Sequence, residues 1–310
     1  MSSIAVGIAG LGKIARDQHA PAIGATPGMH LAAVADPASR HDDVPSYPDV
    51  GAMLAAHPEI AAVSLCMPPR FRAGAARQAI AAGRHVLLEK PPCATLAEAE
   101  ELVRLAEAAG TTLFTAWHSQ QAAAVSRARA WLADASIRSV EVAWKEDVRV
   151  WHPRQAWIWE KGGFGVFDPG INALSILTAI LPGELRVVDA ELTVPSNCVT
   201  PIAAHLRLQG QSGVRVEAEL DFRQTGPQSW NIDIATDRGG LRLSNGGNRL
   251  EIDGEPQEVG EEAEYRGLYQ RFADLIRRGS SAVELAPLRL VEDALAIGRT
   301  VPAEAFEEPA

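Results

Sequence analysis

The sequence predicts an α/β protein. A Rossmann-type, doubly wound parallel sheet is expected first, followed by an α+β domain with an open, mainly antiparallel sheet. Two observations support this prediction. Short apolar strands alternate with helices over roughly the first 120 residues, which is typical of a parallel sheet covered by helices on both faces. Strand-like segments then follow one another between residues 185 and 255 with polar turns between them, which is typical of antiparallel pairing.

The elements of the first half alternate regularly. Strands are expected over residues 3–10, 29–36, 60–68, 84–91 and 111–119, and helices over residues 12–23, 47–58, 70–83 and 95–110. Thr95 and Glu98 have the spacing of a capping box, and Gly110 is a typical helix stop. This half is therefore expected to form one dinucleotide-binding domain, residues 1–120.

The second half begins with a helix and a long strand, and then changes character. The helix is expected over residues 123–135 and the strand over 137–148, followed by a Trp-rich loop and a helix that begins at Asp168. The antiparallel strands are expected over residues 185–194, 201–209, 214–222, 229–236, 241–247 and 249–254, and the closing helices over 264–279 and 287–300. Residues 121–310 are expected to form a domain that binds substrate and forms a dimer.

Composition excludes several classes of partner. The chain has 310 residues and a net charge of -10, which argues against nucleic acid or an anionic membrane surface. No apolar run is long enough to span a bilayer, and the N-terminus lacks the basic start of a signal peptide. Cys66, Cys93 and Cys198 are too widely spaced to indicate disulfides or a structural zinc, so no metal is expected. A cytoplasmic protein is predicted.

A glycine turn joins the first strand to the first helix. Gly10, Gly12 and Ala15 give G-x-G-x-x-A, the pattern that allows a tight turn, approach of the backbone to a pyrophosphate, and close helix packing. Asp36 ends the second strand, where a carboxylate can bind ribose hydroxyls. Residues 7–13 also spell G-x-x-x-x-G-K, but Ile14 replaces the hydroxyl residue that a phosphate-binding loop needs for Mg²⁺. Dinucleotide binding is therefore the preferred interpretation.

The choice of dinucleotide is left open by the sequence. Asp36 favours NAD because a carboxylate repels the 2′-phosphate of NADP, whereas Ser39 and Arg40 just beyond it could receive that phosphate. NAD is predicted, with NADP possible. The residues expected to contact the cofactor are Gly10, Gly12, Lys13, Ile14, Asp36, Ser39, Arg40, Pro68 and Glu89.

Lys90, Asp168 and Asn172 are the catalytic candidates. Lys90 lies at the carboxyl end of a parallel strand, at the edge where open α/β sheets bind their ligands. Asp168 and Asn172 share one helix face because they are four residues apart. Pro169 suits the first position of a helix, so Asp168 is also expected to be the N-cap. A capping residue and a catalytic acid can be the same residue.

The loop before Asp168 has the composition of a sugar site. Aromatic faces suit the C–H faces of a sugar, and carboxylates or imidazoles suit its hydroxyls. The residues expected to contact substrate are His118, Glu146, Trp151, His152 and Trp230.

Three motifs together resemble a known family. They are "GIAGLGKIA" (7–15), "EKPP" (89–92) and "GVFDPGIN" (165–172). With them, essentially the whole chain resembles the glucose-fructose oxidoreductase/inositol dehydrogenase/rhizopine catabolism (Gfo/Idh/MocA) family of NAD(P)-dependent sugar oxidoreductases. The block 144–176 more narrowly resembles the members that oxidise L-arabinose or D-galactose at C1.

The resemblance implies a reaction. It implies hydride transfer from C1 of an aldopyranose to the nicotinamide, giving an aldonolactone, in a dimeric enzyme. The broad family usually has His where this chain has Asn172, and Asn cannot accept a proton, so the general base is expected to be Asp168 or Lys90. Two alternatives stay open: a non-catalytic NAD(P) sensor, and a dehydrogenase that acts at another sugar carbon.

Overall fold

The computed structural model describes residues 3–210 and 213–307, which divide into two compact units. The first unit contains the residues up to His118 together with Glu264–Leu285, and the second contains Ser119–Ala263 and the residues from Ala286 onward. Segment 264–285 therefore groups with the first unit, although the sequence placed it in the second domain. The assignment of residues 1–120 and 121–310 to two separate functions stays a prediction.

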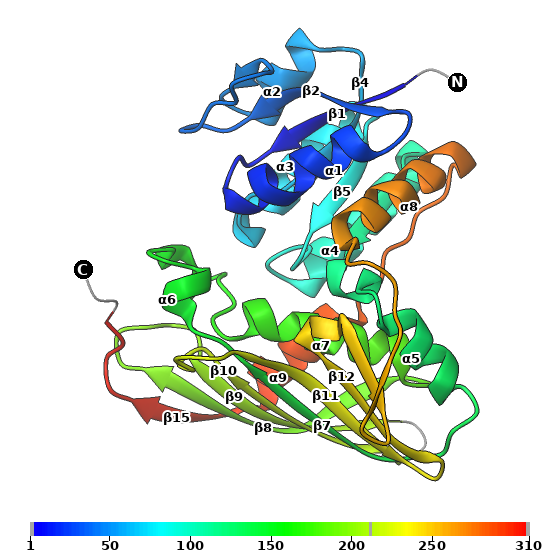
Figure 1. Cartoon of the computed structure of the whole chain (residues 1–310). Coiled ribbons are helices and arrows are strands. Elements are labelled where there is room, and N and C mark those ends of the chain that lie inside the picture. Colours follow the sequence, from blue (N-terminus) through cyan, green and yellow to red (C-terminus); the bar gives the residue numbers. More distant parts are fainter. Residues whose placement is uncertain (1–2, 211–212, 308–310) are drawn as a thin grey trace. The chain divides into compact units, whose positions relative to one another are not determined.

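A parallel sheet forms the centre of the first unit (Figure 1). In the described part of the chain its order is β3-β2-β1-β4-β5-β6, the arrangement of a dinucleotide-binding Rossmann sheet. The strands are β1 Ile4–Ala9, β2 Met29–Ala35, β3 Ser46–Tyr47, β4 Ile60–Leu65, β5 His85–Glu89 and β6 Leu113–Ala116. The predicted fold class is confirmed for this half, and the short β3 is the strand that the sequence did not indicate.

Helices cover both faces of this sheet. On one face α1 (Ala20–Ala25) packs against α8 (Glu264–Arg278), and on the other α2 (Val50–Ala56), α3 (Pro69–Ala81) and α4 (Leu96–Ala109) pack in a row. The apolar side of α8 brings aromatic residues against the residues of β1, which makes α8 part of this core. The capping box of Thr95 and Glu98 is confirmed, and Gly110 adopts a left-handed conformation at the end of α4.

The second unit is built on a mixed, mainly antiparallel sheet. In the described residues its order is β14-β13-β12-β11-β7-β10-β9-β8-β15. The strands are β7 Ile137–Lys145, β8 Leu185–Pro195, β9 Ala203–Gly210, β10 Arg215–Asp221, β11 Ser229–Thr236, β12 Gly239–Ser244, β13 Arg249–Ile252, β14 Glu255–Gln257 and β15 Arg299–Ala303. β7–β10 and β8–β15 are parallel pairs. The sequence did not indicate β14 or β15.

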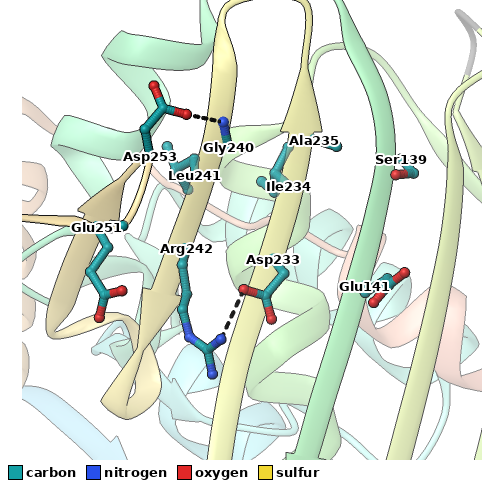
Figure 2. Close-up of a pocket in the computed structure, with 11 residues that line it drawn as sticks. Ser139, Glu141, Asp233, Ile234, Ala235, Gly240, Leu241, Arg242, Glu251 and Asp253 are labelled. Atoms are coloured by element: carbon teal, nitrogen blue, oxygen red, sulfur yellow. Dashed lines mark hydrogen bonds and ion pairs between the residues drawn. The ribbon is translucent and has the colours of Figure 1, made fainter.

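One face of this sheet is covered by helices of the same unit. They are α5 (Val125–Leu132), α7 (Phe167–Ile180) and α9 (Ala286–Ile297), of which α7 packs on both α5 and α9. A shallow depression lies on the opposite, outer face, where Arg242 pairs with Asp233 beside Glu141 and Glu251 (Figure 2). None of the predicted site residues lines it.

Two broad features complete the description. Within residues 3–210 and 213–307, no helix combines the length and low polarity needed to cross a bilayer. The same residues hold no group of three or more His, Cys, Asp or Glu side chains placed to bind a metal. The expectation that no metal is needed stays a prediction.

Candidate functional site

The glycine turn has the geometry that a dinucleotide requires. Gly10 has a φ of +88°, and a Cβ there would lie 2.3 Å from the backbone nitrogen of Met67, so only glycine fits. A Cβ on Gly12 would meet no atom within 4 Å, which leaves its backbone open to a ligand. Ala15 is fully buried against the sheet. The three positions of G-x-G-x-x-A therefore have the geometry that the pattern requires, and the residues present fit the cofactor, although their contacts with it stay a prediction.

The helix after this turn departs from the regular helix that the sequence predicted. Its first part, Ala15–His19, is π-helical, and α1 continues directly from it. Such single π turns often occur at functional sites. Lys13 and Ile14 lie on the exposed surface just before it, where Lys13 pairs with Asp17.

Asp36 follows β2 and binds the backbone of the glycine turn. Its Oδ2 accepts a hydrogen bond from the Leu11 N–H at 2.8 Å, and its Oδ1 accepts from the N–H groups of Ala38 and Ser39. Partial burial alone raises the pKa of Asp36, but these backbone donors outweigh it and lower the pKa. Asp36 is therefore held as a carboxylate at the position where ribose hydroxyls bind in this fold.

Arg40 lies beside Asp36 and is tied to backbone carbonyls. Its Nη1 donates to the carbonyl oxygens of Asp36 and Ser39, and Arg16 donates to the carbonyl of Arg40 itself. The structure thus brings Asp36, Ser39 and Arg40 together, as predicted.

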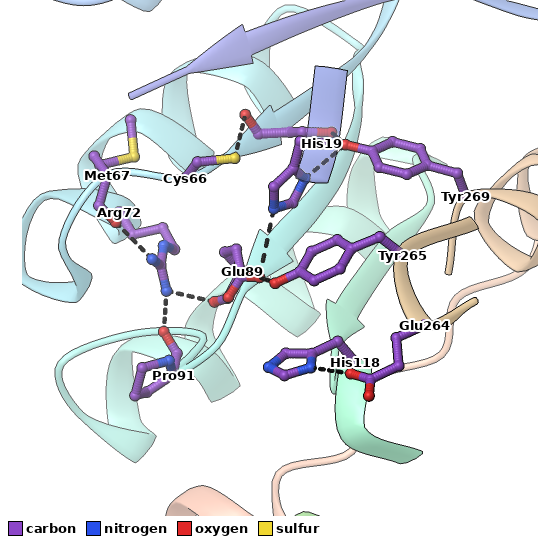
Figure 3. Close-up of polar contacts among 11 residues, drawn as sticks. His19, Cys66, Met67, Arg72, Glu89, Pro91, His118, Glu264, Tyr265 and Tyr269 are labelled. Atoms are coloured by element: carbon purple, nitrogen blue, oxygen red, sulfur yellow. Dashed lines mark hydrogen bonds and ion pairs between the residues drawn. The ribbon is translucent and has the colours of Figure 1, made fainter. Parts of the chain in front are cut away.

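Pro68 and Lys90 follow β4 and β5, so both lie at the carboxyl edge of the sheet. Arg72, on α3, fixes the two loops to each other. Its Nη2 donates to the Met67 carbonyl at 2.5 Å, and its Nη1 donates to the carbonyls of Glu89 and Pro91 on either side of Lys90 (Figure 3). The sequence analysis missed Arg72, although a lone Arg on the apolar face of a helix is a detectable signal.

The Glu89 side chain enters a buried polar network rather than the surface. Its Oε1 accepts from the Tyr265 hydroxyl at 2.6 Å and lies 3.4 Å from Nε2 of His19. His19 Nδ1 lies 2.8 Å from the Tyr269 hydroxyl, which donates its own proton to Ser64 (Figure 3). Because that hydroxyl is already a donor, it accepts from Nδ1–H of His19.

This network fixes the charge of its members. Burial alone lowers the pKa of His19, but its neighbours Cys66, Tyr269 and Glu89 raise it well above its ordinary value. Burial alone raises the pKa of Glu89, but His19 lowers it to about 2. The directions of these pKa shifts favour a buried imidazolium at His19 paired with a buried carboxylate at Glu89, the residue before Lys90.

His118 adjoins the same network. Its ring stacks on Tyr265 at a centroid distance of 5.3 Å, and its Nδ1 lies 2.5 Å from a carboxylate oxygen of Glu264. The sequence placed His118 at the end of the last parallel strand as a substrate contact, whereas β6 ends at Ala116 and His118 begins a short 3-10 helix. That role stays a prediction, and the structure adds Glu264 as the group that orients the ring.

Three predicted sugar contacts meet in the second unit. Glu146 is buried and its Oε2 accepts from the Trp230 indole N–H at 2.9 Å. Trp151 meets the same Trp230 ring edge to face at 5.3 Å, and Trp151 remains exposed. An exposed aromatic face and a carboxylate are thus held together, although 84 residues separate Glu146 from Trp230.

Asp168 is not the N-cap of its helix, so this expectation is wrong. α7 begins at Phe167 after Val166, and no side chain caps it. Asp168 lies within the first turn, is 3% exposed, and its Oδ2 lies 3.4 Å from Nε2 of His152. The helix begins two residues earlier than the proline indicated, just after a turn at Gly165, where a positive φ and the nearby Pro201 carbonyl exclude a Cβ. The helix N-terminus still favours a negative charge at Asp168.

Asn172 follows one turn later on α7 and is partly exposed. The helix carrying both residues packs tightly on the sheet, since a Cβ on Gly170 would lie 2.6 Å from Leu220 of β10. His152 rests on the ring of Phe222, the residue that follows β10. The sequence analysis missed Phe222, which carries no signal beyond being apolar.

The fold and these sites define an oxidoreductase class. Residues 4–117 match the oxidoreductase family with an NAD-binding Rossmann fold, Gfo/Idh/MocA. Galactose 1-dehydrogenase of Pseudomonas fluorescens is 46% identical over 306 residues, which cover 99% of both chains. The chain therefore belongs to this family, and the resemblance inferred from its motifs is confirmed.

Solved structures agree with this assignment. The crystal structure of a D-galactose-1-dehydrogenase protein from Rhizobium etli is similar with a TM-score of 0.95 and 51% identity, covering 99% of each chain. A 3-ketoreductase from Actinomadura kijaniata, solved with NADP, has a TM-score of 0.83 at 19% identity over 97% of this chain and 100% of its own. The second likeness extends to the fold alone.

Proposed function

We propose that the protein oxidises the C1 hydroxyl of an aldopyranose, D-galactose and/or L-arabinose, to the aldonolactone with NAD or NADP. The main support is twofold. The chain is similar over its full length to galactose 1-dehydrogenases. It also has a cluster of residue types that suit a sugar, Glu146, Trp151 and Trp230, of which the first two are close in sequence to the His152–Asp168 pair. L-Arabinose has the ring stereochemistry of D-galactose from C1 to C4 and lacks only the hydroxymethyl group. A site that tolerates that group accepts both sugars.

The proposed reaction removes a hydride and a proton from the sugar. Bound NAD supplies the hydride acceptor, and the C1 hydride leaves with the electron pair of the C–H bond. The O1 proton goes to a base, and the electrons of the O–H bond form the C1=O bond of the lactone. Lys90 is assigned to hydrogen-bond the developing oxyanion, because its ammonium carries only donors.

Asp168 is proposed as the proton acceptor, with His152 as its partner. Nδ1 of His152 lies 3.5 Å from Gln155 Oε1, an atom that only accepts, so this contact favours the tautomer with the proton on Nδ1. Nε2 then faces Asp168, so the imidazole lies beside the carboxylate that is proposed to take the O1 proton. This contact provides an imidazole near Asp168 although position 172 is Asn. Asn172 is assigned to orient the sugar.

The sugar is proposed to lie on aromatic faces with polar groups at its rim. Trp151 and Trp230 offer the faces, and Glu146 and His118 form hydrogen bonds with the sugar hydroxyls. Trp230→Ala should raise the KM for the sugar more than that for the dinucleotide, because it also releases Glu146.

A cofactor-by-sugar activity matrix tests the proposal. NADH or NADPH formation is measured with D-galactose, L-arabinose, D-glucose and D-xylose against each dinucleotide. Turnover is expected with the first two sugars, and its absence with both would overturn the substrate assignment. Dinucleotide binding without oxidation of any aldose would indicate a sensor. A keto-sugar instead of a lactone among the products would place the reaction at another ring carbon.

NAD is the proposed preferred cofactor. Asp36 carries a negative charge at the ribose position, and a 2′-phosphate there is repelled. Asp36→Ser should shift the ratio of kcat/KM for NAD over NADP toward NADP by about tenfold or more. An unchanged ratio would remove Asp36 from cofactor selection.

A homodimer in the cytoplasm is proposed. In the second unit, the outer face of the sheet carries cross-strand ion pairs such as Arg207–Asp189, and no described helix of that unit covers it. Such a face suits a polar interface with a second copy. Sedimentation at several concentrations tests it, and a monomer at micromolar concentration contradicts it. Cell fractionation tests the location.

A further inference from the structure

A row of aromatic rings connects the C-terminal segment with Asp168 inside the second unit. The Phe306 ring lies 5.3 Å from the Trp159 ring, and Trp159 lies 5.9 Å from Phe222. The His152 ring lies 5.8 Å from the same Phe222 ring, and its Nε2 lies 3.4 Å from Oδ2 of Asp168. These four rings, Phe306, Trp159, Phe222 and His152, are called the aromatic row.

The members of the row differ in how firmly they are held. Phe222 is fully buried in the core, so it forms a fixed platform. Trp159 and Phe306 are half-buried. Trp159 therefore contacts both the buried platform and the half-buried Phe306 ring, which is called its cover.

Phe306 is fastened to the unit through its own backbone. The side-chain amide of Asn197 donates to the Phe306 carbonyl at 2.8 Å and accepts from the Phe306 N–H at 2.9 Å. The chain just before it is β15, which pairs with β8 as far as Ala303 and Pro195. The double hydrogen bond fixes the place of the ring after the strand has ended.

The turn that holds Phe306 also holds the loop that contains Trp159. The Val199 N–H donates to the Trp159 carbonyl at 2.9 Å, and the Thr200 hydroxyl donates to the Ile158 carbonyl at 2.8 Å. The Pro201 carbonyl accepts from the Val166 N–H, two residues before Asp168. One turn thus supports the cover, the loop and the start of α7.

His152 and Trp159 belong to the same short loop. Gln155 joins its halves, because its Oε1 accepts from the Trp157 indole N–H at 3.1 Å and faces His152 Nδ1. A loop that rests on Phe222 at both ends keeps the imidazole at a set distance from the carboxylate. Loosening the Trp159 end lets the His152 end shift as well.

We propose that Phe306 is a positioning residue for the His152–Asp168 pair, acting by keeping Trp159 on the Phe222 platform. This inference rests on the proposed function, in which that pair handles the O1 proton. A shift of about 1 Å at a reacting group can lower a rate by about a hundredfold, so an indirect shift through one loop should lower kcat on the order of tenfold.

The test compares Phe306→Leu with Phe306→Tyr. The Leu variant removes the ring and should lower kcat about tenfold with little change in the KM for either substrate, whereas the Tyr variant retains the ring and should restore turnover. The matched control is Trp131→Leu, which removes a ring that contacts Arg238 elsewhere in the same unit. The control should affect the melting temperature only.

The pH profile of kcat separates positioning from loss of folded protein. A smaller folded fraction scales the whole profile without moving it, whereas a displaced pair moves the pH of half-maximal kcat. If Phe306→Leu does not fold, Asn197→Ala releases the same ring without removing it and should show the same shift. The inference is overturned if the pH of half-maximal kcat in Phe306→Leu is unchanged and its kcat equals that of Trp131→Leu. Failure of the wild-type protein to oxidise any aldose overturns the proposed function instead.

Discussion

Two histidine–carboxylate pairs, one in each unit, have the same separation and different surroundings. His19–Glu89 and His152–Asp168 both lie at 3.4 Å. The side chains of the first pair are 0% and 3% exposed, and those of the second are 19% and 4% exposed. The first pair is enclosed by Tyr265, Tyr269 and Ser64, whereas His152 opens to the surface on one side.

The difference assigns the pairs to different tasks. A fully enclosed pair resists the loss of either charge, because removing one leaves the other unpaired in the interior. A pair with one accessible member can exchange its proton with a substrate or with water. Geometry alone does not distinguish the two pairs, but access to solvent does. The first pair is expected to contribute to stability and the second to turnover.

The largest expected effect concerns the accessible pair. Asp168→Asn keeps the shape of the side chain and removes the proton acceptor, so kcat should fall by about 10³-fold, equivalent to about 4 kcal/mol. Steady-state NADH formation with saturating D-galactose measures it. Circular dichroism melting should show a folded protein. Turnover within about tenfold of wild type would place the base elsewhere and give Lys90 that role.

The enclosed pair should respond in stability. Glu89→Gln leaves the His19 charge buried without its partner and should lower the free energy of unfolding by about 3 kcal/mol. Urea unfolding measures it. Glu101→Gln in the exposed pair with Arg77 is the matched control, and its midpoint should move little. Equal shifts of the urea midpoint in both variants would contradict the conclusion that burial makes the first pair important for stability.

His152→Gln tests whether the accessible imidazole affects turnover rather than stability. Removing the accessible imidazole should lower kcat by about 10²-fold while the urea midpoint changes little, since the ring is partly solvated. His57→Gln is the control, because the His57 side chain is 20% exposed and also pairs with a carboxylate, Glu59. A large loss of stability in His152→Gln with normal turnover of the folded protein would reverse the assignment of tasks.

The smallest expected effect is the pH dependence of stability. The pKa of Glu89 is lowered from 4.5 to about 2. Its contribution to the free energy of unfolding is therefore complete above pH 4.5 and is lost as the pH falls toward 2. Between pH 7 and pH 3 the free energy of unfolding should fall by about 2 kcal/mol for this reason, and Glu89→Gln should abolish this fall. The raised pKa of His19 acts oppositely, since its contribution is present below pH 6.5 and is lost as the pH rises through the raised value. Parallel stability curves for wild type and Glu89→Gln would contradict this.

Local patterns predicted much of the fold. Alternating apolar strands and helices, the glycine turn and the capping box at Thr95 are signals within a few residues, and the structure confirms them. Asp168 shows the limit of such signals. Its Pro169 indicated a first helical residue at position 169, whereas α7 begins two residues earlier, at Phe167.

Partners far apart in the chain could not be read from local patterns. The apolar stripe of α8 indicates a helix, but not that it packs on the first unit, because an apolar stripe fits any apolar surface of the right shape. His19 and Tyr269 are 250 residues apart, and Trp159 and Phe306 are separated by most of the second unit.

The sequence by itself therefore determined the class of fold, the dinucleotide turn, the family, and the residue types available for sugar chemistry. These depend on local spacing, which backbone geometry translates directly into strands, turns and helix faces. Only the tertiary structure decided which histidine meets which carboxylate and how much water reaches each pair. That choice depends on packing between distant segments, and burial sets whether a charge is fixed or exchangeable.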